Sequence, residues 1–116
     1  MASSTIFMKR HDTRPHLDVS LQDIDGVAID LSAAVAGVNF TMVDATTKQT
    51  IKINRSACTI IDDTTGQIRY AWVPADTDVA GVYLGEFEVV YDNGDKLTIP
   101  TSGTLSVVVM EDYDNA

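Results

Sequence analysis

Cysteine is almost absent from this chain of 116 residues: Cys58 is the only one, so no disulfide can form within the chain. A chain without disulfides fits a protein that folds in a reducing cytoplasm. The sequence also has no apolar run of the length that a membrane span needs. Residues 1–4, Met-Ala-Ser-Ser, have neither the basic nor the apolar part of a secretion signal. We therefore expect a protein that is made in the cytoplasm and has no membrane partner.

Basic residues are also scarce, with 8 Lys and Arg against 17 Asp and Glu, which gives a net charge of -9. Binding to nucleic acid or to an anionic membrane surface depends on clustered Lys and Arg. We therefore predict that the protein has no nucleic-acid partner. The first interpretation of the acidity is solubility and resistance to self-association. The alternative is an acidic docking surface for a basic partner.

Few of the usual catalytic and metal-binding side chains are present. His11 and His16 have no companion ligands at zinc-like spacing, and Cys58 lies in a context typical of a small buried apolar residue. No G-x-S-x-G elbow and no glycine-rich phosphate loop occurs. The run Asp23-x-Asp25-Gly26 is similar to part of a calcium loop, but it lacks the later ligands, and a hairpin turn explains it equally well. We predict no catalytic residues, no cofactor and no bound metal.

Carboxylates are plentiful, and their arrangement favours surface roles. The runs Asp62-Asp63 and Asp76-x-Asp78 are typical of turns. Glu86 and Glu88 share one face of an expected strand, and two carboxylates at a suitable separation can hydrolyse glycosides. No sign of a cleft accompanies them, so a solvated or interfacial strand face is the preferred interpretation. A small hydrolase is the weakest of the hypotheses considered.

The most informative pattern that is present is the alternation of apolar and polar residues between residues 66 and 91. Such a period of two is what a half-buried strand needs. Ile68, Tyr70 and Trp72 share one face of a first strand at 67–73. In a second strand at 82–91, the residues that share one face include Tyr83, Phe87, Val89 and Tyr91.

The length and the 45% apolar content predict a single domain, residues 1–116, with flexible tails at 1–4 and 111–116. Asp25-Gly26 and Asn93-Gly94 are strong tight-turn dipeptides. The stretch 30–37 could form one helical turn that begins at Ser32 and ends at Gly37. Further strands are expected near residues 5–9, 16–22, 38–43, 49–54, 57–62, 96–99 and 104–110.

The polar corner between the two clearest strands indicates the type of fold. It carries Asp78, Ala80, Gly81 and Tyr83, a D-x-A-G-x-Y pattern that enters a strand. This pattern is typical of the tyrosine corner of immunoglobulin-like sandwiches, in which a tyrosine hydroxyl bonds back to the corner backbone. With Trp72 in the core beside this corner, we predict an all-β, antiparallel immunoglobulin-like β-sandwich of about seven or eight strands with almost no helix.

The parity of the strands gives a list of expected core residues and one exception. The core residues are expected to be Leu17, Val19, Leu21, Phe40, Met42, Ile68, Tyr70, Trp72, Tyr83, Phe87, Val89, Leu105, Val107 and Val109. The exception is the opposite face of the strand at 82–91, where apolar residues accompany two glutamates. Either another segment covers this face or a partner does. The interface candidates are Val82, Leu84, Glu86, Glu88 and Val90.

Motifs over nearly the whole chain carry a family resemblance. In the first half they are Phe7, Lys9, Asp12-Thr13, Pro15, Leu17, Leu21, Asp23, Asp25-Gly26, Ile29-Asp30-Leu31-Ser32, Ala34, Val38, Phe40 and Met42. In the second half they are Gly66, Tyr70, Trp72, Asp76-Thr77, Ala80-Gly81, Tyr83, Glu86-Phe87, Val89, Asp92, Gly94, Thr98, Pro100 and Val107. In their order and spacing they resemble the immunoglobulin-like domain at the N-terminus of phage baseplate upper proteins and in many small structural proteins of tailed phages.

The resemblance implies a non-enzymatic component of a phage virion that docks to other virion proteins, and also to its own copies within a symmetric particle. Baseplate upper proteins continue into a long C-terminal region, whereas this sequence ends soon after its last expected strand. The position in the virion therefore stays open between baseplate, tail, neck and capsid decoration. The alternative function is a binding module of the same fold that takes a host-surface ligand such as a glycan. Exposed aromatic residues at loop tips would favour that alternative.

Overall fold

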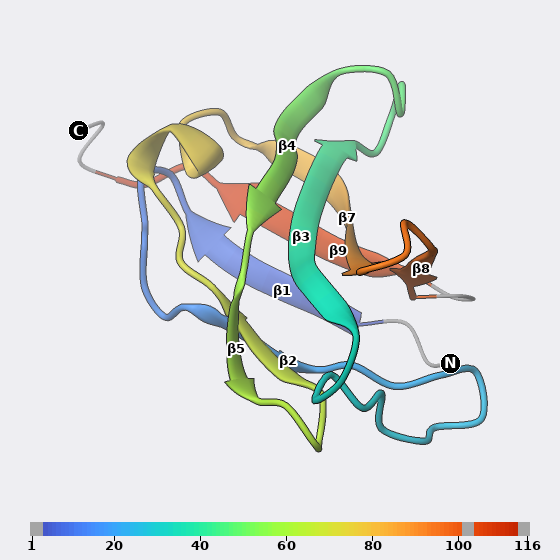
Figure 1. Cartoon of the computed structure of the whole chain (residues 1–116). Helices are drawn as coiled ribbons and strands as arrows, with labels where there is room; N and C mark the ends of the chain where they lie inside the picture. The colour runs from blue at the N-terminus through green and yellow to red at the C-terminus, as the bar shows by residue number, and fades with distance from the viewer. Residues whose placement is uncertain (1–3, 101–103, 114–116) are drawn as a thin grey trace.

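The computed structural model describes residues 4–100 and 104–113, and these residues form a sandwich of two β-sheets (Figure 1). The predicted fold class is confirmed. In the larger sheet the order is β1-β9-β7-β3-β4, with β8 also paired to β7, and in the smaller sheet it is β2-β6-β5. The strand bounds are β1 Ser4–Lys9, β2 Leu17–Ser20, β3 Val35–Asp44, β4 Ile51–Ala57, β5 Thr59–Asp62, β6 Gln67–Tyr70, β7 Gly81–Tyr91, β8 Lys96–Ile99 and β9 Leu105–Met110. The helical content of the described residues is one short 3-10 helix, η1 Pro74–Thr77.

The pairing of the strands differs from a purely antiparallel sandwich at one place. β1 pairs with β9 in parallel over six residues of each strand, whereas the other ladders are antiparallel. β8 and β9 follow one another along the same edge of β7. The chain crosses from one sheet to the other at Cys58, between the end of β4 and the start of β5.

Side chains from both sheets meet in one core. Of the expected core residues, all are buried except Val19, which is half-buried because β2 is an edge strand. The buried apolar residues that the sequence pattern missed are Met8, Leu31, Val38, Ile53 and Ile99. At the centre, the ring of Phe40 lies 5.0 Å from Tyr70, 5.9 Å from Trp72 and 4.9 Å from Phe87 between ring centroids.

Two local predictions are wrong for identifiable reasons. No helical turn forms at 30–37, because Ala34 has a φ of 60° and Val35 already pairs with Tyr91 as the start of β3. The strand expected at 67–73 ends at Tyr70. Beyond it, the amide of Val73 donates to the Asp76 carboxylate at 2.9 Å, which begins η1 in place of a longer strand.

Candidate functional site

The outer face of the six-stranded sheet carries the predicted interface residues. Tyr83 and Phe87 point inward from β7, so Val82 and Leu84, of the opposite parity, point outward. Along the ladders, Phe7 of β1 is paired with Val108 of β9, and Val108 is paired with Val82 of β7. Three apolar side chains from three neighbouring strands therefore form one row. Phe7 is 64% exposed and Val82 is 48% exposed, so water reaches this row directly.

A second row lies beside the first and extends it toward the far edge of the sheet. Leu84 of β7 is paired with Val43 of β3, and Val43 is paired with Ile51 of β4. Ile51 is exposed, and Leu84 and Val43 are half-buried. We call these two rows together the outer patch, and its residues are Phe7, Val43, Ile51, Val82, Leu84 and Val108.

The polar part of the same face begins where the outer patch ends. Glu86 is exposed, and Glu88 lies next to the Arg55 guanidinium, with 3.6 Å between the nearest nitrogen and oxygen. Leu84 and Glu86, together with Lys48 from the loop between β3 and β4, line a shallow hollow of about 330 Å³. The face therefore joins an apolar half to a half that carries two carboxylates.

The five predicted interface residues thus share one face but fall into separate groups. Val82 and Leu84 belong to the outer patch, and Glu86 and Glu88 follow it. Val90 lies beyond the glutamates, where it is paired with Gly37 and Lys96 and is half-buried. Sequence reasoning missed the other four residues of the outer patch. Phe7 and Val108 alternate with inward-facing residues along their strands, so they face outward. This alternation could have identified them from the sequence.

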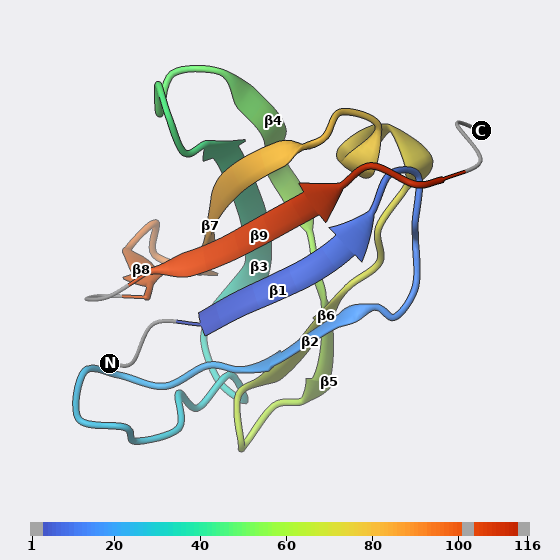
Figure 2. The same cartoon turned by 180° about the vertical axis from the view of Figure 1, so that it is seen from behind.

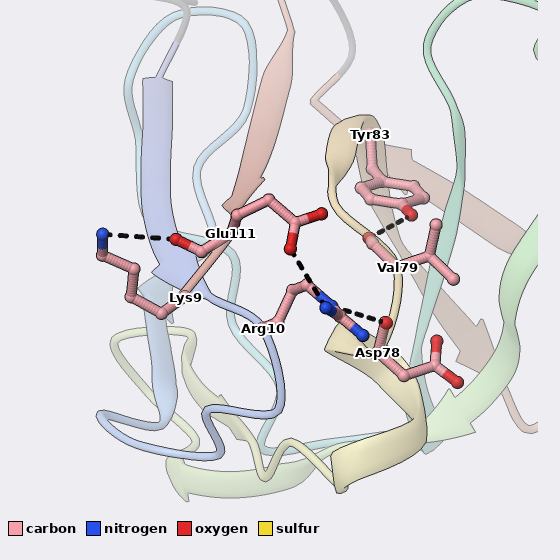
Figure 3. A network of polar contacts seen from close by, with 6 residues as sticks. All are labelled: Lys9, Arg10, Asp78, Val79, Tyr83 and Glu111. Carbon is pink, nitrogen blue, oxygen red and sulfur yellow. Dashed lines mark hydrogen bonds and ion pairs between the residues drawn. The ribbon is translucent and has the colours of Figure 1, made fainter. Parts of the chain in front are cut away.

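The corner before β7 joins three segments that are distant in sequence, as Figure 3 shows. The predicted tyrosine corner is confirmed, because the Tyr83 hydroxyl donates to the Val79 carbonyl at 2.7 Å. Arg10, after β1, donates to the Asp78 carbonyl at 3.0 Å and pairs with the Glu111 carboxylate at 3.0 Å. The Lys9 ammonium donates to the Glu111 carbonyl at 3.5 Å. These contacts fix the ends of β1 and β9 against the corner.

The remaining corner residues also have structural roles. The Asp78 carboxylate pairs with Lys52 of β4, and the hydrogen bond from Lys52 holds the pKa of Asp78 below its usual value. Gly81 begins β7 opposite Val109. Trp72 is buried and packs edge-on against Tyr70, with 5.3 Å between the ring centroids.

A buried carboxylate, that of Asp76 in η1, comes just before this corner in the chain. Asp76 accepts a hydrogen bond from the Tyr70 hydroxyl at 2.7 Å and, as described above, one from the Val73 amide. Burial, with the carboxylate of Asp76 beside it, raises the pKa of Tyr70. Thr77 is fully buried, and its hydroxyl donates to the Asp12 carbonyl at 3.0 Å. The predicted turn run Asp76-x-Asp78 therefore supports the corner.

The scarce reactive side chains lie in different local surroundings. Burial raises the pKa of the Cys58 thiol to about 12, so the thiol is protonated at neutral pH and is a poor nucleophile. His11 is exposed with a φ of 66°, and His16 precedes β2. Asp23 accepts the backbone amides of Asp25 and Val27 at 2.9 and 3.0 Å, as in a turn. Across residues 4–100 and 104–113, no group of three His, Cys, Asp or Glu side chains could hold a metal ion.

Exposed aromatic rings are limited to two of the described residues, Phe7 on β1 and Tyr113 after β9. The Lys9 ammonium lies 4.7 Å from the centre of the Tyr113 ring. None of the described helical segments is long and apolar enough to cross a membrane. Residues 1–3 and 114–116 of the expected tails lie outside the described residues.

No family model matches the chain, and no curated protein matches it. Among solved structures, the chain is similar to CopC from Methylosinus trichosporium OB3b, with a TM-score of 0.40 and 14% sequence identity. The similarity covers 84% of this chain and 95% of that one. A likeness at this level assigns no function.

Proposed function

We propose that this domain is a non-enzymatic assembly module that binds another protein through the outer patch. The observation that carries the proposal is the exposed row of Phe7, Val108 and Val82 across three strands. An antiparallel sheet with one solvated face normally places polar residues on that face. In contrast, β9 reads Val107-Val108-Val109, apolar on both faces. Burial of such a row against a partner is favourable, and apolar side chains at the centre with polar ones around them are typical of protein interfaces.

The partner in this proposal is a larger protein surface and not only a second copy of the chain. The five strands in the order β1-β9-β7-β3-β4 are 6 to 11 residues long. At about 3.3 Å per residue and about 4.8 Å between strands, they give the outer face an area of about 600 Å². A stable interface usually buries about 800 Å² on each partner. Two copies that face each other through this sheet alone fall short of that area, and with a net charge of -9 each they repel. A scaffold that reaches past the sheet supplies the missing area.

The setting we propose to test first is a tailed-phage virion, in which the partner is another virion structural protein. This setting is supported by the sequence resemblance alone. The outer patch supports docking to a protein and does not distinguish one assembly from another. A glycan-binding role has less support, because Phe7 lies on a strand among aliphatic side chains rather than at a loop tip.

The experiment measures how much of the domain is incorporated into virions in cells that produce the phage. We expect Val82→Lys to reduce incorporation at least tenfold, because a buried unpaired charge opposes docking. The matched control is Ile61→Lys, which places the same charge at an exposed apolar position of β5, in the smaller sheet.

Both variants are first shown to fold by circular dichroism. Equal incorporation of Val82→Lys and the unchanged chain would exclude the outer patch as the docking surface. Equal loss in Ile61→Lys would show that the effect is one of charge in general. A hydrolytic activity that purifies with the protein would exclude the non-enzymatic part of the proposal.

A further inference from the structure

The strand β2 forms an open edge of the smaller sheet. Among the described residues, β2 has β6 as its one partner strand. The Leu21 amide donates to the Gly66 carbonyl at 2.8 Å, which continues the β2–β6 ladder. Because backbone groups alternate between the two sides of a strand, the N–H and C=O groups of Asp18 and Ser20 point away from β6. They form a short row of groups ready to pair with another strand.

A cleft lies directly beside this edge, between the two sheets. Figure 2 shows β1 and β2 as neighbouring edges of the two sheets, with β1 in the larger one. The cleft has a volume of about 440 Å³ and extends from Val19 on β2 to Ile6 on β1, with Phe87, Ile99 and Leu105 at its base. This volume is within the range of binding pockets, and the lining is mostly apolar.

The sheet edges at β4 and β5 are less suited to pairing with another strand than the edge at β2. Ladder irregularities interrupt β4 and β5, and charged residues lie on or next to both, which are features that oppose further strand pairing. β2 keeps a regular register with β6 along all four of its residues. The single charged residue of β2, Asp18, is engaged by Arg69 at 2.7 and 3.2 Å. The edge beside the cleft is therefore regular and its charge is neutralised.

Charges of opposite sign lie at the two ends of β2, and they favour one orientation of a segment bound beside it. Arg14 and His16 precede the strand, and among the described residues Arg14 has no ion-pair partner. Asp23 and Asp25 follow the strand, and Asp25 is exposed. One end of the edge is therefore positive and the other end is negative. An extended segment that pairs antiparallel to β2 meets the acidic end with its first residues and the basic end with its last residues.

We propose that this cleft binds an extended strand of a partner protein, which adds to the smaller sheet antiparallel to β2. The partner segment has aliphatic side chains at alternate positions, which enter the cleft, with a basic residue at its start and an acidic residue at its end. Backbone hydrogen bonds to Asp18 and Ser20 supply affinity, and the cleft supplies selectivity for the side chains. This inference goes beyond the proposed function, because it uses a different edge of the molecule from the outer patch.

The test uses a synthetic eight-residue peptide in which valine and threonine alternate, with lysine at its start and glutamate at its end. Titration calorimetry measures binding, and hydrogen exchange followed by NMR measures protection of single amides. We expect saturable binding and about tenfold slower exchange of the Asp18 and Ser20 amides. A peptide with the two charged ends exchanged should bind more weakly.

Ser20→Pro removes one outward N–H without removing a β2–β6 hydrogen bond, and it should weaken binding about tenfold.

Two further variants keep the test decisive. Val19→Lys occupies the cleft lining and should abolish binding if Ser20→Pro does not fold. Phe7→Ser alters the outer patch and should leave peptide binding unchanged, which separates this inference from the proposed function. The inference is wrong if no peptide binds, if a peptide of the same composition without alternation binds equally, or if protection falls on the β5 edge. Decanoate binding in the cleft without peptide binding would also overturn it, in favour of a small apolar ligand.

Discussion

Replacement of Gly85 by alanine tests how tightly the core packs against β7. A Cβ atom at this position would lie 2.7 Å from Cε1 and 2.9 Å from Cζ of the Phe40 ring. The ring has little room to withdraw, because Tyr70, Trp72 and Phe87 surround it. Overpacking of this kind costs about 1–3 kcal/mol. The alanine also restricts the unfolded chain, which offsets about 0.4–1 kcal/mol. We therefore expect a net loss of about 1–2 kcal/mol in the free energy of unfolding.

Urea unfolding measures this loss, which should lower the midpoint by about 0.5–1 M for a chain of this size. The matched control is Gly37→Ala in β3, where an added Cβ would meet nothing within 4 Å. The control should stay within about 0.5 kcal/mol of the unchanged chain. A smaller residue at Phe40 should relieve the clash, so Phe40→Leu and Gly85→Ala together should cost less than the sum of their separate effects. If Gly85→Ala is as stable as Gly37→Ala, or if the double variant is additive, the clash is not the cause.

Three further predictions concern the corner and the thiol. Tyr83→Phe removes the hydrogen bond to Val79 and should cost about 1–2 kcal/mol in urea unfolding, and an unchanged midpoint would contradict this role. Trp72→Ala should cost about 3–5 kcal/mol, because the whole indole is buried, and a loss below about 1 kcal/mol would show that the site collapses around the smaller side chain. The Cys58 pKa is raised from 9.0 to about 12 in the folded chain, so the stability linked to the protonated thiol is complete below pH 9 and is lost between pH 9 and 12. Cys58→Ala should flatten that decline, and an unchanged pH profile of the urea midpoint would exclude the effect.

The fold could be predicted from the sequence where local pattern and global packing agree. The alternation at residues 68–72 and along β7 placed Tyr70, Trp72, Tyr83 and Phe87 in the core, and the pattern before Tyr83 identified the corner. The parallel pairing of β1 with β9 could not be predicted in this way, because alternation shows which face of a strand is buried and not which strand lies beside it. The helical turn predicted at residues 30–37 is wrong for the same reason. The pairing of Val35 with Tyr91 outweighs a weak local tendency to form a turn.

The candidate site was only partly predictable for a related reason. The outward parity of β7 drew attention to Val82 and Leu84 from the sequence alone. Phe7 and Ile51 join them only through strand register, across β9 for Phe7 and across β3 for Ile51. The cleft beside β2 depends on the spacing of two sheet edges, and strand patterns contain no information on that spacing.

The two faces of β7 differ in what the isolated domain requires of them. The inward side chains of Phe87 and Val89 are fully buried, so folding alone explains their apolar character. Val82 is 48% exposed, so folding removes only about half of its surface from water and explains its apolar character only in part. In the proposed function, the outer patch is too small to hold a partner by itself, so the partner would also contact Glu86 and the neighbouring polar surface. A partner that leaves the Glu86 carboxylate buried and unpaired would lose affinity. The partner surface expected from these constraints is therefore apolar at its centre, with basic groups on the side that meets Glu86.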